Sequence, residues 1–196
     1  MRTLLIICIL LFPTSGFSQS DDPYVYGEIG MGVGKYTMYQ GSVNCILKER
    51  HSVSLSYYRN WRNAEALPSD YEGWLISFGK PNDKLIFMAA TYGRVVVLTN
   101  ITRLNLKAGP LFGTYRYLSD FVRSAAWFSP NYTYTRYREN TYGLLFNPSF
   151  ELSFTNTWGL SMGGHVLVTN NQYSYAIQAA LIAGSLRKAL KDKNFE

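Results

Sequence analysis

Few residues in this chain have the type and spacing that catalysis or metal binding requires. Its 196 residues include two histidines, His51 and His165, which lie far apart in the sequence and form no metal-binding motif. One catalytic arrangement can be written down, with His165 as the base for Ser161 and Glu151 orienting the imidazole. A serine nucleophile needs such a base within hydrogen-bond reach and a group that holds the base in place. Nothing else in the chain strengthens this arrangement, so we expect no catalytic residue, no metal and no cofactor.

Five other positions carry ionisable groups in the middle of segments that alternate between large apolar and small polar residues. They are Glu28, Arg103, Lys107, Glu151 and His165. A charge inside a narrow protein interior is costly unless an opposite charge and hydrogen bonds compensate it. If the segments that carry these residues form one barrel, we expect a polar network that plugs its lumen. A conduit for small solutes is the alternative role of the same residues.

The elements that must position these residues are β-strands, because apolar residues recur with a period of two. In the clearest segment, residues 141–154, the side chains of Tyr142, Phe146 and Phe150 share one face, and small or polar residues share the other. Comparable alternation covers residues 25–36, 52–57, 103–112, 158–168 and 174–184. Beyond the first residues, no apolar segment is long enough for a transmembrane helix.

Two architectures produce such alternation: a soluble sandwich with its apolar faces inward, and a transmembrane barrel with its apolar faces toward lipid. The alternating segments are about 10 to 15 residues long, as a tilted membrane-spanning strand requires, whereas soluble strands average about five or six. Aromatic residues gather at the segment ends, as in the girdles at two membrane interfaces. The sequence therefore predicts an all-β protein, a closed antiparallel transmembrane β-barrel.

Nine segments qualify as strands, and closed bacterial barrels use an even number. We expect eight strands, with ten as the alternative, and the stretch Leu85–Leu98 separates its two faces least cleanly. Tight turns are expected at residues 48–51, 81–84 and 155–157, on the periplasmic side. Longer polar connections are expected at residues 60–72 and 118–140, on the outside.

The chain begins with the layout of a secretory signal peptide. Arg2 is followed by the apolar run Leu4–Phe12, and small residues at Gly16 and Ser18 suit cleavage after Ser18. We expect residues 1–18 to be the signal peptide, residues 19–187 the barrel and residues 188–196 a charged tail. Only Cys45 would remain in the mature chain, which predicts no internal disulfide.

The region between Tyr115 and Tyr142 is the most distinctive, because aromatic residues and arginines alternate in it. Arginine can pair with phosphate in bidentate geometry, and aromatic residues with arginine also suit protein recognition. Because we expect the chain to be exported, we expect no nucleic-acid partner. The segment Tyr132–Arg138 alternates, which suggests a hairpin that extends beyond the membrane. The sequence predicts an external binding loop with six candidate residues, namely Arg123, Trp127, Tyr132, Tyr134, Arg136 and Arg138.

Four short segments carry a family resemblance. They are Phe17-Ser18-Gln19, Gly27-Glu28-Ile29-Gly30, the run Leu75–Lys80, and the close Ala183–Arg187. With them the chain resembles the small outer-membrane β-barrel proteins of Gram-negative bacteria. The resemblance implies an eight-stranded barrel in the outer membrane, inserted by the barrel assembly machinery, and in contact with outer-membrane lipid and lipopolysaccharide.

Three functions follow for a protein of this kind. We expect a non-enzymatic barrel with a plugged polar lumen, whose surface loops bind or adhere to an external ligand that the sequence does not identify. The resemblance also suggests a lipid A-modifying enzyme, since some outer-membrane barrels deacylate lipid A with a histidine, a serine and an acid; His165 would be its base. A narrow solute channel is the third hypothesis.

Overall fold

The computed structural model describes residues 23–72, 80–124 and 130–186. The expected signal peptide (residues 1–18), the charged tail (188–196), Trp127 and most of the segment Leu75–Lys80 lie outside these described residues. The described part holds no helix with the length and hydropathy to cross a membrane.

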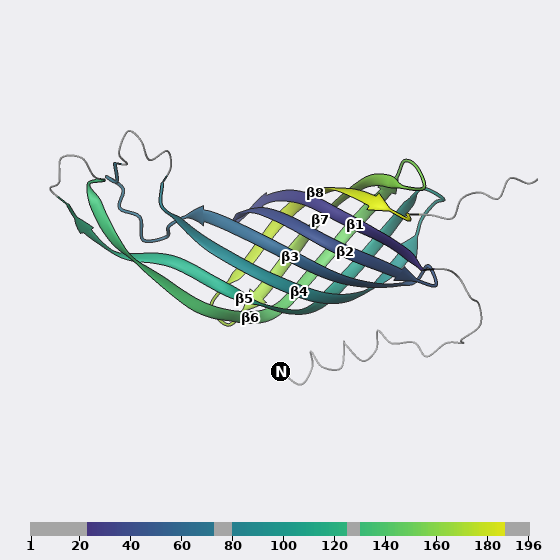
Figure 1. The fold of residues 1–196 in the computed structure, drawn as a ribbon, viewed down its shortest axis with the longest axis horizontal. Coiled ribbons are helices and arrows are strands. Elements are labelled where there is room, and N and C mark those ends of the chain that lie inside the picture. Colours follow the sequence, from purple (N-terminus) through teal and green to yellow (C-terminus); the bar gives the residue numbers. More distant parts are fainter. Residues whose placement is uncertain (1–22, 73–79, 125–129, 187–196) are drawn as a thin grey trace, which may run out of the picture.

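Eight antiparallel strands form one closed barrel, in which each strand pairs with the next and the last pairs with the first (Figure 1). Closure is direct, with Ile29 opposite Leu181. The expected eight strands are therefore confirmed. The strands are β1 (Tyr24–Gly34), β2 (Thr37–Leu47), β3 (His51–Asn63), β4 (Asn82–Val97), β5 (Thr102–Arg123), β6 (Tyr132–Ser153), β7 (Trp158–Thr169) and β8 (Tyr173–Gly184).

The period-two pattern of the sequence becomes an inside and an outside. In β8, Ser174, Gln178 and Ile182 are buried inside the barrel, whereas Ile177 and Leu181 are 75% and 62% exposed on its outer surface. The same division holds around the barrel, and Tyr142, Phe146 and Phe150 all point outward. A soluble sandwich would hide these side chains, so that alternative is wrong.

The exposed apolar side chains form a continuous belt around the barrel. Along β5 the belt runs from Leu104 to Phe112, a rise of about 26 Å along the strand at roughly 3.3 Å per residue. For strands tilted by roughly 40° this is about 20 Å along the membrane normal, close to the apolar band of about 25 Å of a transmembrane barrel. Because soluble proteins rarely expose large apolar patches, this belt must lie in the hydrocarbon of a membrane.

The two ends of the barrel differ. At one end, short turns at residues 48–50, 98–101 and 154–157 join the strands, and both described chain ends lie there (Figure 1). Lys48 and Glu49 form the first of these turns with positive φ angles of 51° and 55°. The expected turns near residues 48–51 and 155–157 agree with this end, which is the periplasmic one by the usual rule for such barrels.

The opposite end departs from the predicted connections. The turn expected at residues 81–84 is wrong, because β4 begins at Asn82 and residues 64–81 form a long connection that starts with a hydrogen bond from the Ala64 amide to the Pro81 carbonyl. The loop expected at residues 118–140 is largely strand. β5 continues to Arg123 and β6 begins at Tyr132, so a β-hairpin extends beyond the barrel wall.

The belt yields a test that compares two equally exposed positions. Met162 near the middle of β7 and Val122 in the hairpin are each 63% exposed. We expect Met162→Arg to lower the free energy of unfolding in phospholipid vesicles by about 2–4 kcal/mol, because its charge enters hydrocarbon. Val122→Arg should change it by less than about 0.5 kcal/mol, as at an ordinary surface site. Urea titration measures both, and equal effects would contradict the assigned lipid-facing belt.

Candidate functional site

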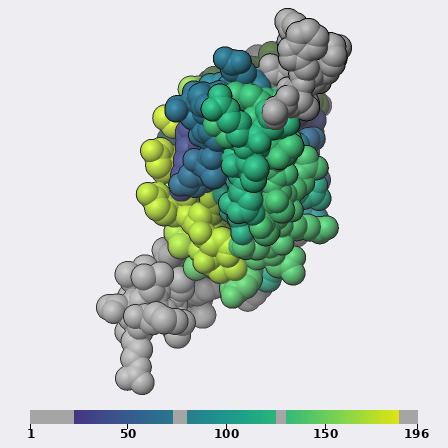
Figure 2. Space-filling model, turned by 90° about the vertical axis from the view of Figure 1, so that its left-hand side faces the viewer, coloured from purple at the N-terminus to yellow at the C-terminus, as the bar shows by residue number. Residues whose placement is uncertain are grey.

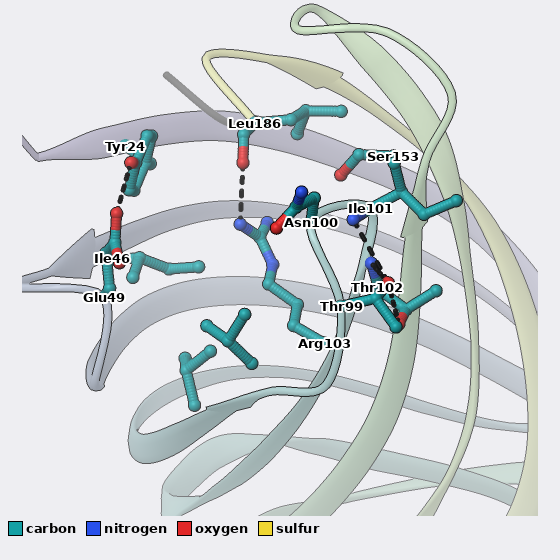
Figure 3. A pocket seen from close by; sticks show the side chains of 12 residues that line it. Tyr24, Ile46, Glu49, Thr99, Asn100, Ile101, Thr102, Arg103, Ser153 and Leu186 are labelled. Atoms are coloured by element: carbon teal, nitrogen blue, oxygen red, sulfur yellow. Dashed lines mark hydrogen bonds between the residues drawn. The ribbon is translucent and has the colours of Figure 1, made fainter. Parts of the chain in front are cut away.

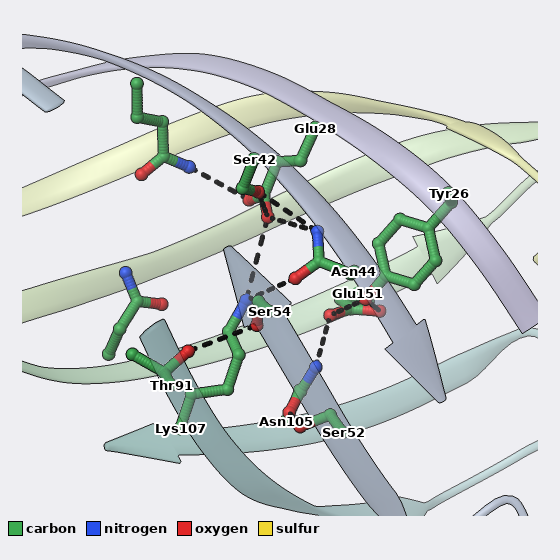
Figure 4. A network of polar contacts seen from close by, with 12 residues as sticks. Tyr26, Glu28, Ser42, Asn44, Ser52, Ser54, Thr91, Asn105, Lys107 and Glu151 are labelled. Atoms are coloured by element: carbon green, nitrogen blue, oxygen red, sulfur yellow. Dashed lines mark hydrogen bonds and ion pairs between the residues drawn. The ribbon is translucent and has the colours of Figure 1, made fainter. Parts of the chain in front are cut away.

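The inside of the barrel contains a polar network centred on two carboxylates (Figure 4). The first is Glu28 on β1, whose oxygens accept hydrogen bonds from Gln40 at 3.0 Å, from Ser42 at 3.1 Å and from Asn44 at 3.3 Å. The ammonium of Lys107 on β5 lies 3.7 Å from Glu28 and donates to the Asn44 side-chain oxygen at 3.1 Å. Alternation on β1, β2 and β5 brings these side chains to the inner face, where all are buried.

The second carboxylate, Glu151 on β6, pairs with Arg103 on β5. The Nε of Arg103 donates to Glu151 at 2.6 Å, because the two residues are direct partners in the β5–β6 register. Tyr26 and Asn105 donate to the same carboxylate at 2.8 and 3.0 Å. Arg103 also lies over the Tyr26 ring, 5.0 Å from its centroid. Opposite charge and hydrogen bonds compensate most of the cost of burying this pair, although the Nη2 of Arg103 has no hydrogen-bond partner among the described residues.

A second, apolar layer fills the outer half of the lumen. Tyr58 stacks on Phe87 with ring centroids 4.7 Å apart, and buried aliphatic side chains from several other strands pack around them. These side chains are Met38, Leu85, Leu111, Leu145 and Leu167. An eight-stranded barrel is just wide enough for its own side chains, and here polar and apolar layers together occupy that width.

The interior does not bring His165, Ser161 and Glu151 together as the catalytic hypothesis required. The imidazole of His165 is buried beside Tyr58, at 5.7 Å between ring centroids, and its nitrogens have no hydrogen-bond partner among the described residues. Ser161 lies four residues away on β7, about 13 Å along the strand, and its hydroxyl is also without a partner in that part of the chain. The carboxylate of Glu151 is already occupied by Arg103, Tyr26 and Asn105.

A cavity of about 510 Å³ opens at the periplasmic end of the barrel (Figure 3). Arg103 lines it from the inside, and its Nη1 donates to the carbonyl oxygen of Leu186 at 2.9 Å. The Leu186 side chain packs with Tyr24, Ile46 and Val95 in a buried apolar cluster. The segment after β8 therefore turns back over the barrel mouth and adds to the plug.

The hairpin formed by β5 and β6 dominates the external end, where Figure 2 shows it in teal and green beside the blue residues of the β3–β4 connection. Its far part pairs Arg123 with Tyr132, and its near part pairs Arg116 with Arg138. Four further positions were named from the sequence. Tyr134 packs on Phe121 at 5.5 Å between ring centroids, Arg136 lies opposite Leu118, Arg138 is exposed, and Trp127 lies outside the described residues.

The β3–β4 connection braces this hairpin at two levels. Near the barrel, Asp83 accepts hydrogen bonds from the backbone amides of Leu118 and Glu65, both at 3.1 Å. Near the tip, the Asn131 side chain accepts from the Glu72 amide at 2.9 Å, and Tyr132 donates to Asp70 at 2.9 Å. Sequence reasoning missed Asp83, although a lone acid at the start of an apolar segment was a visible signal.

The inner face of the hairpin carries a row of stacked tyrosines, also missed from the sequence. The rings of Tyr115 and Tyr117 lie 5.3 Å apart, and those of Tyr117 and Tyr137 lie 5.4 Å apart. The hydroxyl of Tyr117 donates to Glu139 at 2.8 Å, and the hydroxyl of Tyr137 donates to Asp120. Each hydrogen bond to a carboxylate raises the pKa of the tyrosine above its ordinary value.

The comparisons with known proteins agree with this architecture. No protein-family model matches the chain, and no curated protein matches it. Among solved structures, the N-terminal β-barrel domain of Pseudomonas aeruginosa OprF superposes with a TM-score of 0.58 and 10% identity, over 84% of this chain and 98% of that one. Neisserial surface protein A superposes with a TM-score of 0.51 and 12% identity, over 85% and 99% of the two chains.

The fold is that of a small outer-membrane β-barrel. Identities of 10% and 12% establish the architecture and nothing finer. Outer-membrane barrels of this kind carry an apolar outer band, a filled interior and longer external loops. The barrel described above has each of these features.

The interior network of this outer-membrane barrel can be tested at its most connected group. We expect Glu151→Ala to lower the free energy of unfolding by about 3–5 kcal/mol, because Arg103 keeps its charge and loses its partner. Replacing both members, as Arg103→Met with Glu151→Leu, should cost less than the single change because no unpaired charge remains. Urea unfolding in vesicles measures both variants. A Glu151→Ala protein as stable as the parent would show that the pair contributes nothing.

Proposed function

We propose that this protein is a non-enzymatic outer-membrane barrel that binds an external ligand with its β5–β6 hairpin, in an adhesion role. The observation that carries the proposal is the brace. Asp83, Asp70 and Glu72 of the β4 start and the β3–β4 connection hold a hairpin that extends well past the strands on the other side of the barrel. The part of the hairpin beyond the apolar belt does not help to span the membrane. Because contacts with the β3–β4 connection hold it in one position, we infer that it binds an external partner.

The surface of the hairpin suits such a role. Tyrosine and arginine are enriched where proteins bind one another. Tyrosine gives a large contact area with few rotatable bonds, and arginine carries several hydrogen-bond donors in one planar group. Stacking and hydrogen bonds to Glu139 and Asp120 hold the tyrosines of the inner face before any ligand arrives. Preorganisation of this kind lowers the entropy cost of binding. Among the six residues named from the sequence, Arg123, Tyr132, Tyr134, Arg136 and Arg138 are the described members of the proposed binding element.

The interior favours binding over transport. The polar network of Glu28, Lys107, Arg103 and Glu151, with His165 beside the apolar layer, is proposed as the plug that keeps the barrel rigid. Large side chains and two ion pairs fill the lumen, and this filling argues against the passage of solutes. The channel hypothesis is therefore the weaker one.

Adhesion can be measured on cells of a Gram-negative host that lacks adhesins of its own. Cells that carry the barrel are applied to surfaces coated with collagen, fibronectin or mucin, and the attached cells are counted. We expect attachment to at least one surface, and a loss of about ten-fold or more for Tyr117→Ala with Tyr137→Ala, the size seen when binding hot spots are truncated. Tyr175→Ala, an exposed residue of the lipid-facing surface on β8, is the matched control.

The adhesion role fails if cells with the intact barrel attach to all three surfaces no better than cells with an empty vector. It also fails if the tyrosine variant and the Tyr175→Ala control attach equally well. Heat-modifiable migration on a gel shows in each case that the barrel is folded.

The enzyme alternative is tested by His165→Ala. Because His165 has no hydrogen bond to a hydroxyl or an acid among the described residues, we expect the lipid A of cells that carry the variant to have the same acylation as with the parent protein. Mass spectrometry of extracted lipid A is the measurement. A parent protein that removes an acyl chain, together with a variant that does not, would restore the enzyme.

A further inference from the structure

Three cations lie in one line on the outer surface where β4 meets the β5–β6 hairpin. In the strand register, Lys84 on β4 lies directly opposite Arg116 on β5, and Arg116 lies directly opposite Arg138 on β6. Direct partners in antiparallel strands point to the same face, with Cβ atoms about 4.5–5.5 Å apart. The neighbours Asp83 and Leu85 of Lys84 are buried, so Lys84 and the line that it begins face away from the barrel axis.

Nothing in the described part of the chain neutralises this line. None of the ion pairs found there includes Lys84, Arg116 or Arg138. The two acids of the hairpin, Asp120 and Glu139, bond to the tyrosines of the opposite, inner face. The hairpin therefore has one face with positive charge and one with tyrosine and negative charge.

A line of like charges on adjacent strands is destabilising unless an anion lies between them. Lys35, at the outer end of the barrel, shows the contrast, because its ammonium donates to the Tyr173 carbonyl at 3.0 Å and lies over the Tyr173 ring. The three cations of the line have no such contacts with described residues. Because the described residues supply no counter-ion, we infer that an anion from outside the chain lies between these cations.

The distance of these three cations from the apolar belt identifies that partner. Phe112 and Tyr142 are direct partners at the outer edge of the apolar belt, and both are exposed to lipid. Arg116 and Arg138 lie four residues beyond them, about 13 Å along the strand, or about 10 Å along the membrane normal for a strand tilted by roughly 40°. This is the depth of lipid headgroups, where phosphate is the characteristic anion of an outer-leaflet glycolipid.

We propose that Lys84, Arg116 and Arg138 form a binding site for the phosphate groups of outer-leaflet lipopolysaccharide. Guanidinium groups match phosphate in bidentate geometry, and two of them beside an ammonium can hold one or two phosphate groups. The site deepens the proposed function, because a hairpin held to the lipid by its cationic face keeps its opposite, tyrosine face away from the lipid and accessible to an external ligand. It rests on the outer-membrane placement, and it does not require the adhesion role.

The test measures lipid A binding to the folded full-length barrel in non-ionic detergent, by native mass spectrometry. Two probes differ only in phosphate: lipid A with both phosphates, and the same lipid A after dephosphorylation. We expect the parent protein to bind the bisphosphate form at least about ten-fold more tightly. Arg116→Gln with Arg138→Gln should weaken bisphosphate binding by about ten- to a hundred-fold and leave binding of the dephosphorylated form unchanged, as expected for lost hydrogen bonds to a charged group.

Arg50→Gln with Arg94→Gln is the matched control, because it removes the same charge at the periplasmic end of the barrel. We expect this control to change bisphosphate binding by less than about three-fold. Two results would overturn the proposal: equal affinity of the parent for both lipids, or an equal loss in the two double variants, which would reflect net charge alone. A barrel that fails the adhesion assay and still prefers the bisphosphate form leaves this site in place.

Discussion

The structure depends on one constraint, which is that backbone polar groups have no water to bind inside a membrane. Each N–H and C=O of a spanning strand must pair with a neighbouring strand, so the sheet has to close on itself. The pairing of β1 with β8 meets this requirement and removes the last open edge from the apolar region. Once the sheet is closed, every side chain points either to lipid or to the lumen, and the division of the chain into apolar and polar positions follows.

The lumen created by this closure is too narrow for unpaired charges. Glu28 and Lys107 compensate one another, as do Glu151 and Arg103. Amide and hydroxyl side chains donate further hydrogen bonds to the oxygens of the two carboxylates. The Glu28–Lys107 pair joins β1 to β5 across the lumen, whereas the Arg103–Glu151 pair joins the neighbouring strands β5 and β6. The interior thereby supports the wall, and any recognition is left to the external end.

Much of the fold could be predicted from alternation alone, because each strand in the membrane must place apolar groups on one face and small or polar groups on the other. Alternation assigned Glu28, Arg103, Lys107 and Glu151 to one face of their strands. It could not predict which of them meet, because that depends on the register between strands. His165 shares their face and yet lies beside Tyr58, away from both carboxylates. The alternation of Tyr132 to Arg138 suggests a hairpin, but its full length could not be predicted, because outside the membrane neither face of a strand needs to be apolar. The opposition of Arg116 and Arg138 likewise becomes visible only with the pairing of β5 and β6.

The position of Leu186 links the segment after β8 to the polar interior of the barrel. Its carbonyl oxygen accepts a hydrogen bond from Arg103, and its backbone amide donates to the Asn156 carbonyl at 2.8 Å. The Nη1 of Arg103 has this acceptor only when the residues after β8 lie at the barrel mouth. Closure of the wall and solvation of a buried cation are therefore coupled: β8 closes the barrel against β1, and the segment that directly follows β8 supplies an acceptor to the Arg103 guanidinium.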